Sequence, residues 1–377
     1  MHWEPLFAES AATIRRRSRF LVAELAVPHV VLSTSVRNGG CVEHVRYLVN
    51  HQSCEGSGHQ ARSHHIHAAG QDAYHDLVCD EIGIPSDASV VMGTAANMNY
   101  AAIVTAADGD VSVTAAVTAG VQSNATCAGD VANWREGPDG VVKALAVAGT
   151  INTILLVNRP VTLPTLARIV VTMTEGKSAA LQRLAVPSCA SSDLATGTGT
   201  DQFCVAAPSA GAWTITSAST HMKFGELVGR AVRDATMEAL RWQNGLEPSY
   251  TRSLFHALGR YGVKEERIID DLTDRLSAED LELLRRNSKA AFYEPLVGAA
   301  AHALAAVLDR ARHGALPSSI LSEAAVQHAA TLAVSLAAMP ERWAEFRARL
   351  HDAGPHDPRT LVLSAIALGW SEKWRTS

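Results

Sequence analysis

Three glycine- and threonine-rich segments of this 377-residue chain each lead into an apolar run. They are Gly93-Thr94, Gly149-Thr150-Ile151-Asn152 and Thr196-Gly197-Thr198-Gly199-Thr200-Asp201. The last two flank a fourth polar segment, Thr174-Glu175-Gly176-Lys177. Together they supply hydroxyls, backbone N–H groups, a carboxylate and an amine at the expected ends of buried strands, where open α/β sheets commonly bind ligands. We therefore predict a polar pocket in an otherwise hydrophobic protein.

Hydrophobic periodicity predicts the elements that position these segments: a layered α/β core with a mixed sheet and flanking helices over 1–245, then an all-helical extension over 246–377. Residues 1–27 are interpreted as an amphipathic lead-in, and 133–140 as a loop. Strands are expected at 29–36, 43–49, 90–92, 100–106, 111–119, 153–157, 203–207 and 213–217. Helices are expected at 72–82, 164–184, 221–242, 281–286, 299–312, 320–338, 340–350 and 359–374.

Composition excludes several classes of protein. The net charge is −5 and no basic stripe occurs, which argues against nucleic acid as a partner. No stretch approaches the roughly 20 apolar residues of a membrane helix, so no membrane partner is expected. The six cysteines are scattered, which argues against a disulfide scaffold and favours a cytoplasmic protein. The apolar helix faces of the extension must be buried against another surface, and the interface of a homo-oligomer could provide it.

Histidine and cysteine are concentrated in residues 51–79. His75 and Cys79 lie four apart on a predicted helix, and His64 and His67 lie in the adjoining loop. Imidazole and thiolate together suit Zn²⁺ or iron, including haem iron. The spacing fits no standard zinc motif, so surface histidines with buried cysteines remain the alternative.

Several segments, in the order they occur, carry a resemblance to a known family. They are Leu32-Ser33-Thr34-Ser35 with Asn38-Gly39-Gly40, Gly93-Thr94-Ala95-Ala96, Thr118-Ala119-Gly120-Val121 with Ser123-Asn124-Ala125, Gly149-Thr150-Ile151-Asn152, Thr174-Glu175-Gly176-Lys177, and Ala195 through the 196–201 segment. This pattern resembles the adenosylcobinamide amidohydrolases, the CbiZ-type enzymes of corrinoid salvage, over residues 20–245. The resemblance implies hydrolysis of the amide between the corrin ring and its aminopropanol arm, giving adenosylcobyric acid.

Amide hydrolysis needs a base, a nucleophile or activated water, and donors for the oxyanion. Glu175 is the candidate base and Lys177 a candidate electrostatic clamp, although residues two apart on a helix do not share a face and a solvated face is the alternative. Thr198 and Asp201 complete the catalytic set. The Gly/Thr alternation suits an oxyanion hole, with a flexible turn capped by Asp201 as the alternative.

Further polar residues of the same segments are candidate substrate contacts, with turn formation as the alternative for several of them. They are Asn38, Gly39, Gly40, Thr94, Ser123, Asn124, Thr150, Asn152, Thr196 and Thr200. The 51–79 segment departs from the family, since its counterpart there is not this rich in His and Cys.

Two further hypotheses therefore stay open. One is a divergent paralogue that uses the fold as a metal- or haem-dependent enzyme on another metabolite. The other is a non-enzymatic binder of tetrapyrroles or metal. If the protein acts on a corrinoid, cobalt is present as part of the substrate, and a histidine could coordinate it.

Overall fold

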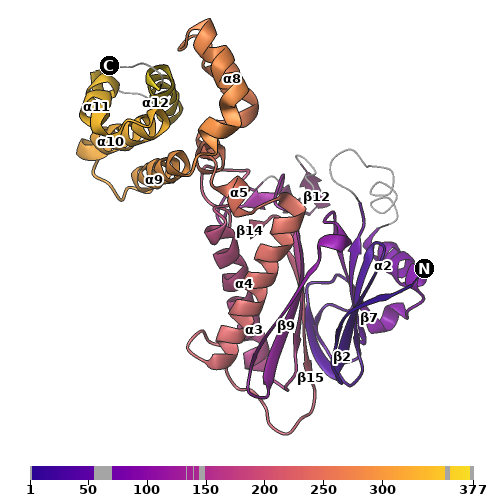
Figure 1. Cartoon of the computed structure of the whole chain (residues 1–377). Helices are drawn as coiled ribbons and strands as arrows, with labels where there is room; N and C mark the ends of the chain where they lie inside the picture. Colours follow the sequence, from indigo (N-terminus) through magenta and orange to yellow (C-terminus); the bar gives the residue numbers. More distant parts are fainter. Residues whose placement is uncertain are drawn as a thin grey trace. The chain divides into compact units, whose positions relative to one another are not determined.

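The chain folds into two compact units, Met1–Leu246 and Glu247–Ser377. The computed structural model describes residues 2–54, 70–132, 134–138, 140–143, 149–352 and 357–373. Mixed sheets with flanking helices make up the first unit, and the second is helical (Figure 1). This confirms the predicted fold class.

The first sheet has the strand order β1-β2-β3-β6-β7. Its strands are β1 (Glu4–Ala8), β2 (Ala12–Arg17), β3 (Phe20–Leu25), β6 (Tyr47–Gln52) and β7 (Ser89–Thr94). Neighbours pair antiparallel except β6 and β7, which are parallel. The predicted amphipathic lead-in is therefore wrong, because residues 1–27 form three strands. In β2, Ala12 and Ile14 are buried and Thr13 between them is not, which is the period of a strand, while in β3 both faces are covered and Phe20 through Ala23 are all buried.

The second sheet has the strand order β5-β4-β15-β13-β9-β8. Its strands are β4 (His29–Ser33), β5 (Gly40–Val42), β8 (Ala102–Asp108), β9 (Val111–Ala119), β13 (Ile151–Val157) and β15 (Gln202–Pro208). Only β13 and β15 pair in parallel, so the sheet is mixed. The strands expected at 100–106 and 111–119 are confirmed as β8 and β9, which pair antiparallel on either side of the turn at Gly109 and Asp110.

Three local predictions in this unit are wrong. The strand expected at 43–49 is β6, which begins only at Tyr47 and pairs in the first sheet, while β5 is the strand that pairs with β4. The expected loop at 133–140 contains the hairpin β11 (Trp134–Gly137) with β12 (Gly140–Lys143). The expected strand at 213–217 makes only an isolated bridge between Ile215 and Val161.

The two sheets pack face to face and helices cover their outer faces (Figure 1). Between the sheets lie apolar side chains of both, for example Leu48 and Met92 from the first and Ile154 and Cys204 from the second. Helix α2 (Gln71–Ile82) covers the first sheet, while α3 (Leu163–Arg183) and α4 (Lys223–Asn244) cover the second. The unit therefore has four layers: helix, sheet, sheet and helices.

Helix ends follow the signals in the sequence. Thr162 caps α3 by accepting the N–H of Thr165, and Gly245 ends α4 in the left-handed conformation. The two helices approach closely at Gly176, where a Cβ would lie 2.8 Å from the carbonyl oxygen of Gly229. Glycine at 176 thus allows the two helices to pack this closely.

Strand direction brings the polar segments to one end of the sandwich. Asn152 is the second residue of β13. Strand pairing places it opposite Thr118 near the end of β9 and opposite Gln202 at the start of β15. In the first sheet, Gln52 and Thr94 end their strands side by side. The segments singled out in the sequence therefore meet at the end of the sandwich where β6, β7 and β9 end and β13 and β15 begin.

The second unit consists of helices around its own apolar core. They are α5 (Pro248–Thr251), α6 (Leu254–Leu258), α7 (Ile268–Asp271), α8 (Ala278–Phe292), α9 (Pro295–Arg312), α10 (Ser318–Ala337), α11 (Trp343–Asp352) and α12 (Pro358–Glu372). The longer ones coincide with the predicted helices. Leu304, Ala330 and Ile366 are examples of side chains fully buried among them.

One described helix, α10, is long and apolar enough to cross a membrane by length and composition. The stretch is Ser319–Ala337, with a mean hydropathy of 1.3. Taken together as one bent segment, α8 and α9 meet the same requirements of length and composition. The expectation that no stretch approaches this length is therefore wrong. Half of that stretch is buried, and α10 packs against α9, α11 and α12, as a core helix does.

Candidate active site

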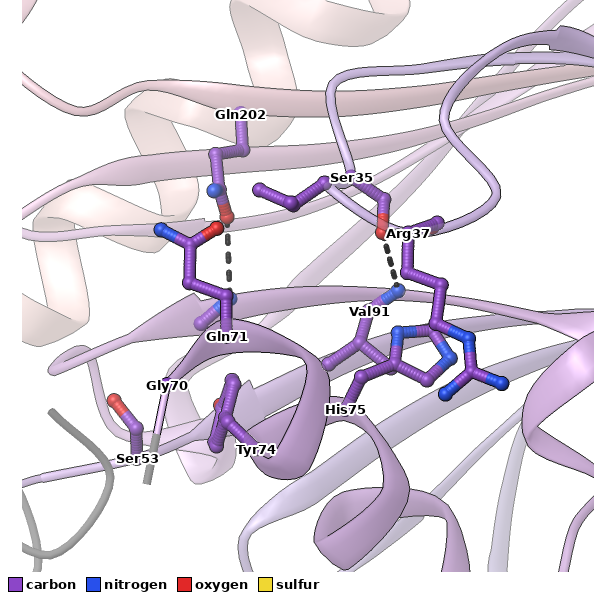
Figure 2. Close-up of a pocket in the computed structure, with 11 residues that line it drawn as sticks. Ser35, Arg37, Ser53, Gly70, Gln71, Tyr74, His75, Val91 and Gln202 are labelled. Carbon is purple, nitrogen blue, oxygen red and sulfur yellow. Dashed lines mark hydrogen bonds between the residues drawn. The ribbon is translucent and has the colours of Figure 1, made fainter. Parts of the chain in front are cut away.

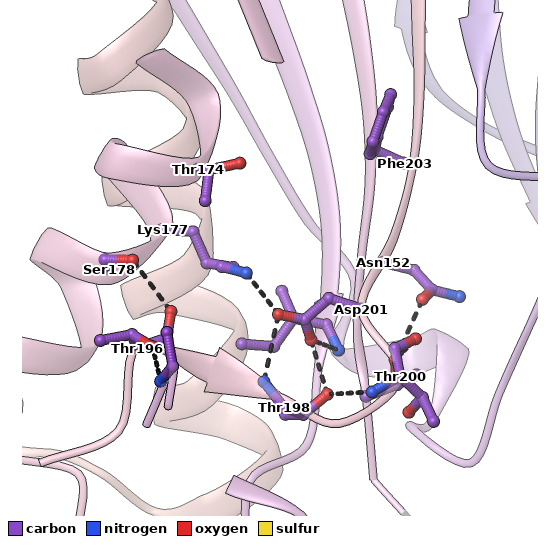
Figure 3. Close-up of polar contacts among 12 residues, drawn as sticks. Asn152, Thr174, Lys177, Ser178, Thr196, Thr198, Thr200, Asp201 and Phe203 are labelled. Carbon is purple, nitrogen blue, oxygen red and sulfur yellow. Dashed lines mark hydrogen bonds and ion pairs between the residues drawn. The ribbon is translucent and has the colours of Figure 1, made fainter. Parts of the chain in front are cut away.

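An ion pair between Lys177 and Asp201 forms the centre of the polar cluster (Figure 3). Lys177 extends from α3, and Asp201 directly precedes β15, so the pair joins a helix to a strand end. The two side chains are only 15% and 18% exposed. At this burial the pair is shielded from most of the solvent that weakens surface pairs.

The carboxylate of Asp201 accepts four hydrogen bonds. Oδ2 accepts from the Lys177 ammonium and from the N–H of Thr198 at 3.1 Å. Oδ1 accepts from the Thr198 hydroxyl at 2.6 Å and from the N–H of Ile151 at 3.0 Å. A carboxylate has about four lone-pair sites, so this one is saturated. Asp201 is therefore suited to holding Lys177 and Thr198 in place.

Gly197 leaves the room that this ion pair occupies. A Cβ at this position would lie 2.5 Å from Oδ2 of Asp201 and 2.8 Å from Nζ of Lys177. Real Cβ atoms do not approach so closely, so only glycine is compatible with this geometry. The glycine–threonine alternation thus has a steric cause at this position.

The remaining threonines tie the 196–201 segment to its neighbours. The Thr150 hydroxyl donates to the carbonyl of Thr200 at 2.7 Å. Asn124 donates through Nδ2 to the carbonyl of Gly149 at 2.7 Å and to Oγ1 of Thr200 at 3.1 Å. Thr196 accepts at Oγ1 from the N–H of Ala128 at 2.8 Å. The structure therefore brings Asn124, Thr150, Thr196, Thr198 and Thr200 together, as the predicted site requires.

Backbone donors of this segment are used inside the protein. The N–H groups of Thr196, Thr198 and Gly199 donate to Thr126, Asp201 and Asn124. The N–H of Thr200 donates to the hydroxyl of Thr198 at 3.4 Å. These groups are not available to an oxyanion, so the geometry favours the alternative of a turn capped by Asp201.

A buried polar layer lies between the two sheets next to this cluster. Nδ2 of Asn152 donates to Oδ1 of Asn50 at 2.9 Å and to the carbonyl of Gly93 at 3.1 Å. Nδ2 of Asn50 donates to the hydroxyl of Thr118 at 2.8 Å. Both asparagines are 0% exposed, and burial without such partners would be costly.

Sequence reasoning missed Asn50 and Thr118 as members of the site. The signal was present, since Leu48 and Asn50 share the face of β6 that meets the second sheet. A polar residue at such a core-facing position calls for a partner. The partner itself lies 102 residues away in the sequence and follows only from the packing of the sheets.

Several predicted substrate contacts serve turns. Asn38 has a φ of 55° and donates through Nδ2 to the carbonyls of Ser86 and Ser89. A Cβ on Gly39 would lie 1.8 Å from the carbonyl oxygen of Ser35, and Gly40 has a φ of 76°. The structure thus gives these three residues a turn role between β4 and β5. Thr94 is buried and accepts the N–H of Ala96, while Ser123 is exposed.

Glu175 lies on the exposed face of α3. Within the described ranges, its carboxylate makes no hydrogen bond or ion pair. Because residues two apart point to different sides of a helix, it does not join Lys177 in the cluster. Its predicted role as a base stays a prediction.

The predicted metal ligands are placed only in part. A ring N–H of His75 donates to the carbonyl of Ser86 at 2.9 Å, and burial lowers the pKa of this histidine. Burial raises the pKa of the Cys79 thiol to about 11. Among the described residues, no group of three or more His, Cys, Asp and Glu side chains could hold a metal ion. His64 and His67 lie outside the described residues.

Comparison with known proteins adds to this geometry. The family model of CbiZ, adenosylcobinamide amidohydrolase, matches residues 6–248. A protein of Methanocaldococcus jannaschii, described only as uncharacterized, is 33% identical over 183 residues, which cover 46% of this chain and 71% of the relative. Both polar groups described above lie inside the matched region, and almost all of the helical unit lies outside it.

Proposed function

Since the chain belongs to the adenosylcobinamide amidohydrolase family, we propose that it hydrolyses the amide between the corrin ring of adenosylcobinamide and its aminopropanol arm. The products are adenosylcobyric acid and 1-amino-2-propanol, which places the reaction in corrinoid salvage. The observation that carries the proposal is the convergence of the family's polar segments on the Lys177–Asp201 pair.

Lys177 is the group suited to stabilise the oxyanion. Its ammonium has three donors, and in the described part of the chain Asp201 is its single hydrogen-bond partner. Two N–H bonds therefore remain for the carbonyl oxygen of the scissile amide. A preformed donor of this kind acts most strongly where negative charge develops in the transition state.

Asp201 is a positioning residue in this mechanism. Its four hydrogen bonds fix the ammonium of Lys177 and the hydroxyl of Thr198 relative to each other. In the overall reaction, water adds across the amide, the C–N bond breaks, and the amine leaves with a proton. The carboxylate that forms stays on the corrin ring.

Incubation of the purified protein with adenosylcobinamide tests the proposal, with both products followed by mass spectrometry. We expect Lys177→Met to lower kcat/KM by about 100-fold or more, the size seen on removing an oxyanion donor. Lys223→Met is the matched control, since Lys223 also pairs with a carboxylate but is 55% exposed. Full activity of Lys177→Met, or no product from the natural chain, would contradict the proposal.

The same incubation identifies the nucleophile. If Thr198 attacks, the intact protein gains the mass of a corrinoid ester early in the reaction. If water attacks, no such species forms, and Thr198→Val retains hydrolysis. Attack by water is our proposal, because the Thr198 hydroxyl proton is engaged by a saturated carboxylate.

The metal-dependent alternative is tested by elemental analysis of the purified protein. A stoichiometric metal that is lost on replacing His64 or His67 would support it.

We also propose a cytoplasmic location, because all six cysteines are free and Cys41 and Cys189 are exposed. Self-association through the helical unit, which exposes Leu296 and Ile320, is a proposal that light scattering tests.

A further inference from the structure

A cavity lies beside the start of β15, where Gln202 forms part of its wall (Figure 2). Its volume is about 470 Å³, and its lining includes Gln202, Gly93 of β7, and Gln71 and Tyr74 of α2. Cys204 points between the sheets, so Gln202, two residues before it, does so as well, whereas Asp201 points toward α3. The mechanism proposed above leaves this cavity unused.

The chemistry of the lining favours a neutral polar ligand. Two carboxamides, a phenol and the hydroxyls of Ser35 and Ser53 face it, and its described lining contains no carboxylate or lysine. The guanidinium of Arg37 is paired with Asp76 at 2.6 Å, so its charge is already balanced. Among the described lining residues, no lysine or unpaired arginine is available to an anion.

The volume favours a group of nucleoside size. Drug-sized ligands fill cavities of roughly 300–1,000 Å³. A corrin ring with all its arms is much larger than this cavity, so only one appendage of such a substrate can enter. A single acetamide arm would leave most of the space empty. The aminopropanol arm belongs at Lys177.

Gln202 is held so that its donor group is presented to the cavity. Its Oε1 accepts the N–H of Gly93 at 3.1 Å, which fixes the orientation of the carboxamide. Across the described ranges, its Nε2 has no hydrogen-bond partner, and it is not among the buried unsatisfied atoms. This amide therefore offers two N–H donors, which match the ring-nitrogen acceptors of a purine such as N7 of adenine.

Tyr74 supplies an oriented aromatic ring in the same wall. Its hydroxyl lies 2.7 Å from Nδ1 of His51, which is fully buried and stacked on Phe20. A Cβ on Gly93 would lie 3.2 Å from that hydroxyl, so glycine at this position lets Tyr74 pack closely against β7 and fixes the place of the ring. Purine bases stack well on such rings.

We infer that this cavity binds the 5′-deoxyadenosyl group of the corrinoid, with Gln202 and Tyr74 as residues that set specificity for the adenosylated substrate. The identity of the ligand rests on the proposed function. The cavity itself and its chemistry do not, so the two can fail separately.

Titration with 5′-deoxyadenosine, followed by saturation-transfer NMR, tests the inference on the full chain. Gln202→Glu keeps an oxygen for the N–H of Gly93 but replaces the donor group, and we expect binding to weaken roughly tenfold. Gln243→Glu is the matched control, because Gln243 accepts the N–H of Asn97 at 2.9 Å outside the cavity. Thermal melting of both variants verifies folding. Equal binding by the two variants, or none by the natural chain, would overturn the inference.

Kinetics separate the inference from the proposed function. We expect the natural chain to show a lower KM for adenosylcobinamide than for hydroxocobinamide, and Gln202→Glu to raise the KM for adenosylcobinamide toward that for hydroxocobinamide. Hydrolysis with equal KM for both corrinoids overturns the cavity assignment and leaves the function intact. Binding of 5′-deoxyadenosine without any hydrolysis overturns the function and leaves the cavity assignment intact.

Discussion

The side-chain amide of Asn152 in β13 donates to the side-chain oxygen Oδ1 of Asn50 in β6, 2.9 Å away, and so links the two sheets. Both residues are fully buried between the sheets, next to the hydroxyl of Thr118 and close to apolar side chains such as Leu48 and Ile154. The link lies at the end of the sandwich that also holds Lys177 and Asp201. It therefore connects the stability of the sandwich to the position of the candidate site.

Replacing Asn152 by leucine should destabilise the first unit. The change leaves Oδ1 of Asn50 and the carbonyl of Gly93 without their donor, which costs about 2–3 kcal/mol in free energy of unfolding. Urea unfolding measures this cost. Asn158→Leu serves as control, since Asn158 also makes two hydrogen bonds but lies nearer the surface, and it should cost less. Equal costs would contradict the importance given to the buried layer.

Lys177 and Asp201 should prove energetically coupled. Each single change, Lys177→Met or Asp201→Asn, leaves a partly buried group without its partner, and about 1–3 kcal/mol of stability is lost. The double variant should lose less than the sum of the two. A double-mutant cycle by urea unfolding measures the coupling. The exposed pair Lys223–Glu226 is the reference, and its coupling should be much smaller because solvent screens both charges.

Gly197→Ala should impair catalysis more than stability. The added methyl group would occupy the space of the ion pair and displace the Lys177 ammonium from its position. We expect kcat/KM to fall by about tenfold or more, because a shift of this size removes a preformed donor. Gly259→Ala, where nothing lies within 4 Å of the new Cβ, should leave both properties unchanged. Normal activity of the Gly197 variant would show that the ion pair can move without consequence.

Cysteine reactivity should follow burial. Burial raises the pKa of Cys79 to about 11 and that of Cys204 to about 12, so both thiols stay protonated and shielded near pH 8. Cys41 and Cys189 are exposed and should react with iodoacetamide first. Peptide mass spectrometry after timed labelling gives the order. Early labelling of Cys79 in the folded protein would indicate a thiolate, as a metal ligand requires.

Stability should fall as the pH is lowered through about 6.5. Burial lowers the pKa of His29 and His75 below their usual 6.5, so both are neutral in the folded protein. As the pH falls, these histidines take up protons in the unfolded chain before they do so in the folded protein, and this favours unfolding. Their contribution to the free energy of unfolding is therefore fully present above pH 6.5 and is lost below it. Melting temperatures between pH 7.5 and 5.5 measure the effect. His75→Gln should flatten this dependence, whereas substituting the exposed His351 should not.

Local features of the fold could be predicted from the sequence because their causes are local. The period of 3.6 and the cap residues Thr162 and Gly245 define α3 and α4, and Asp108-Gly109-Asp110 defines the hairpin of β8 and β9. Lys177, Thr198 and Asp201 were identified as a group because their segments resemble one family. Their contact in space is the structural fact that joins them.

Tertiary structure alone decided which strand joins which sheet and which groups are already engaged. Residues 47–52 and 29–33 are near neighbours in sequence, yet they belong to different sheets, because strand pairing depends on partners far along the chain. For the same reason, only packing placed Asn50 and Thr118 beside the candidate site and Gln202 in the wall of the cavity. The sequence by itself determined the family, the helices and the chemistry available. Long-range contacts decided that the carboxylate of Asp201 already accepts four hydrogen bonds and that Glu175 lies outside the polar cluster. They also decided that a cavity lies beside the start of β15.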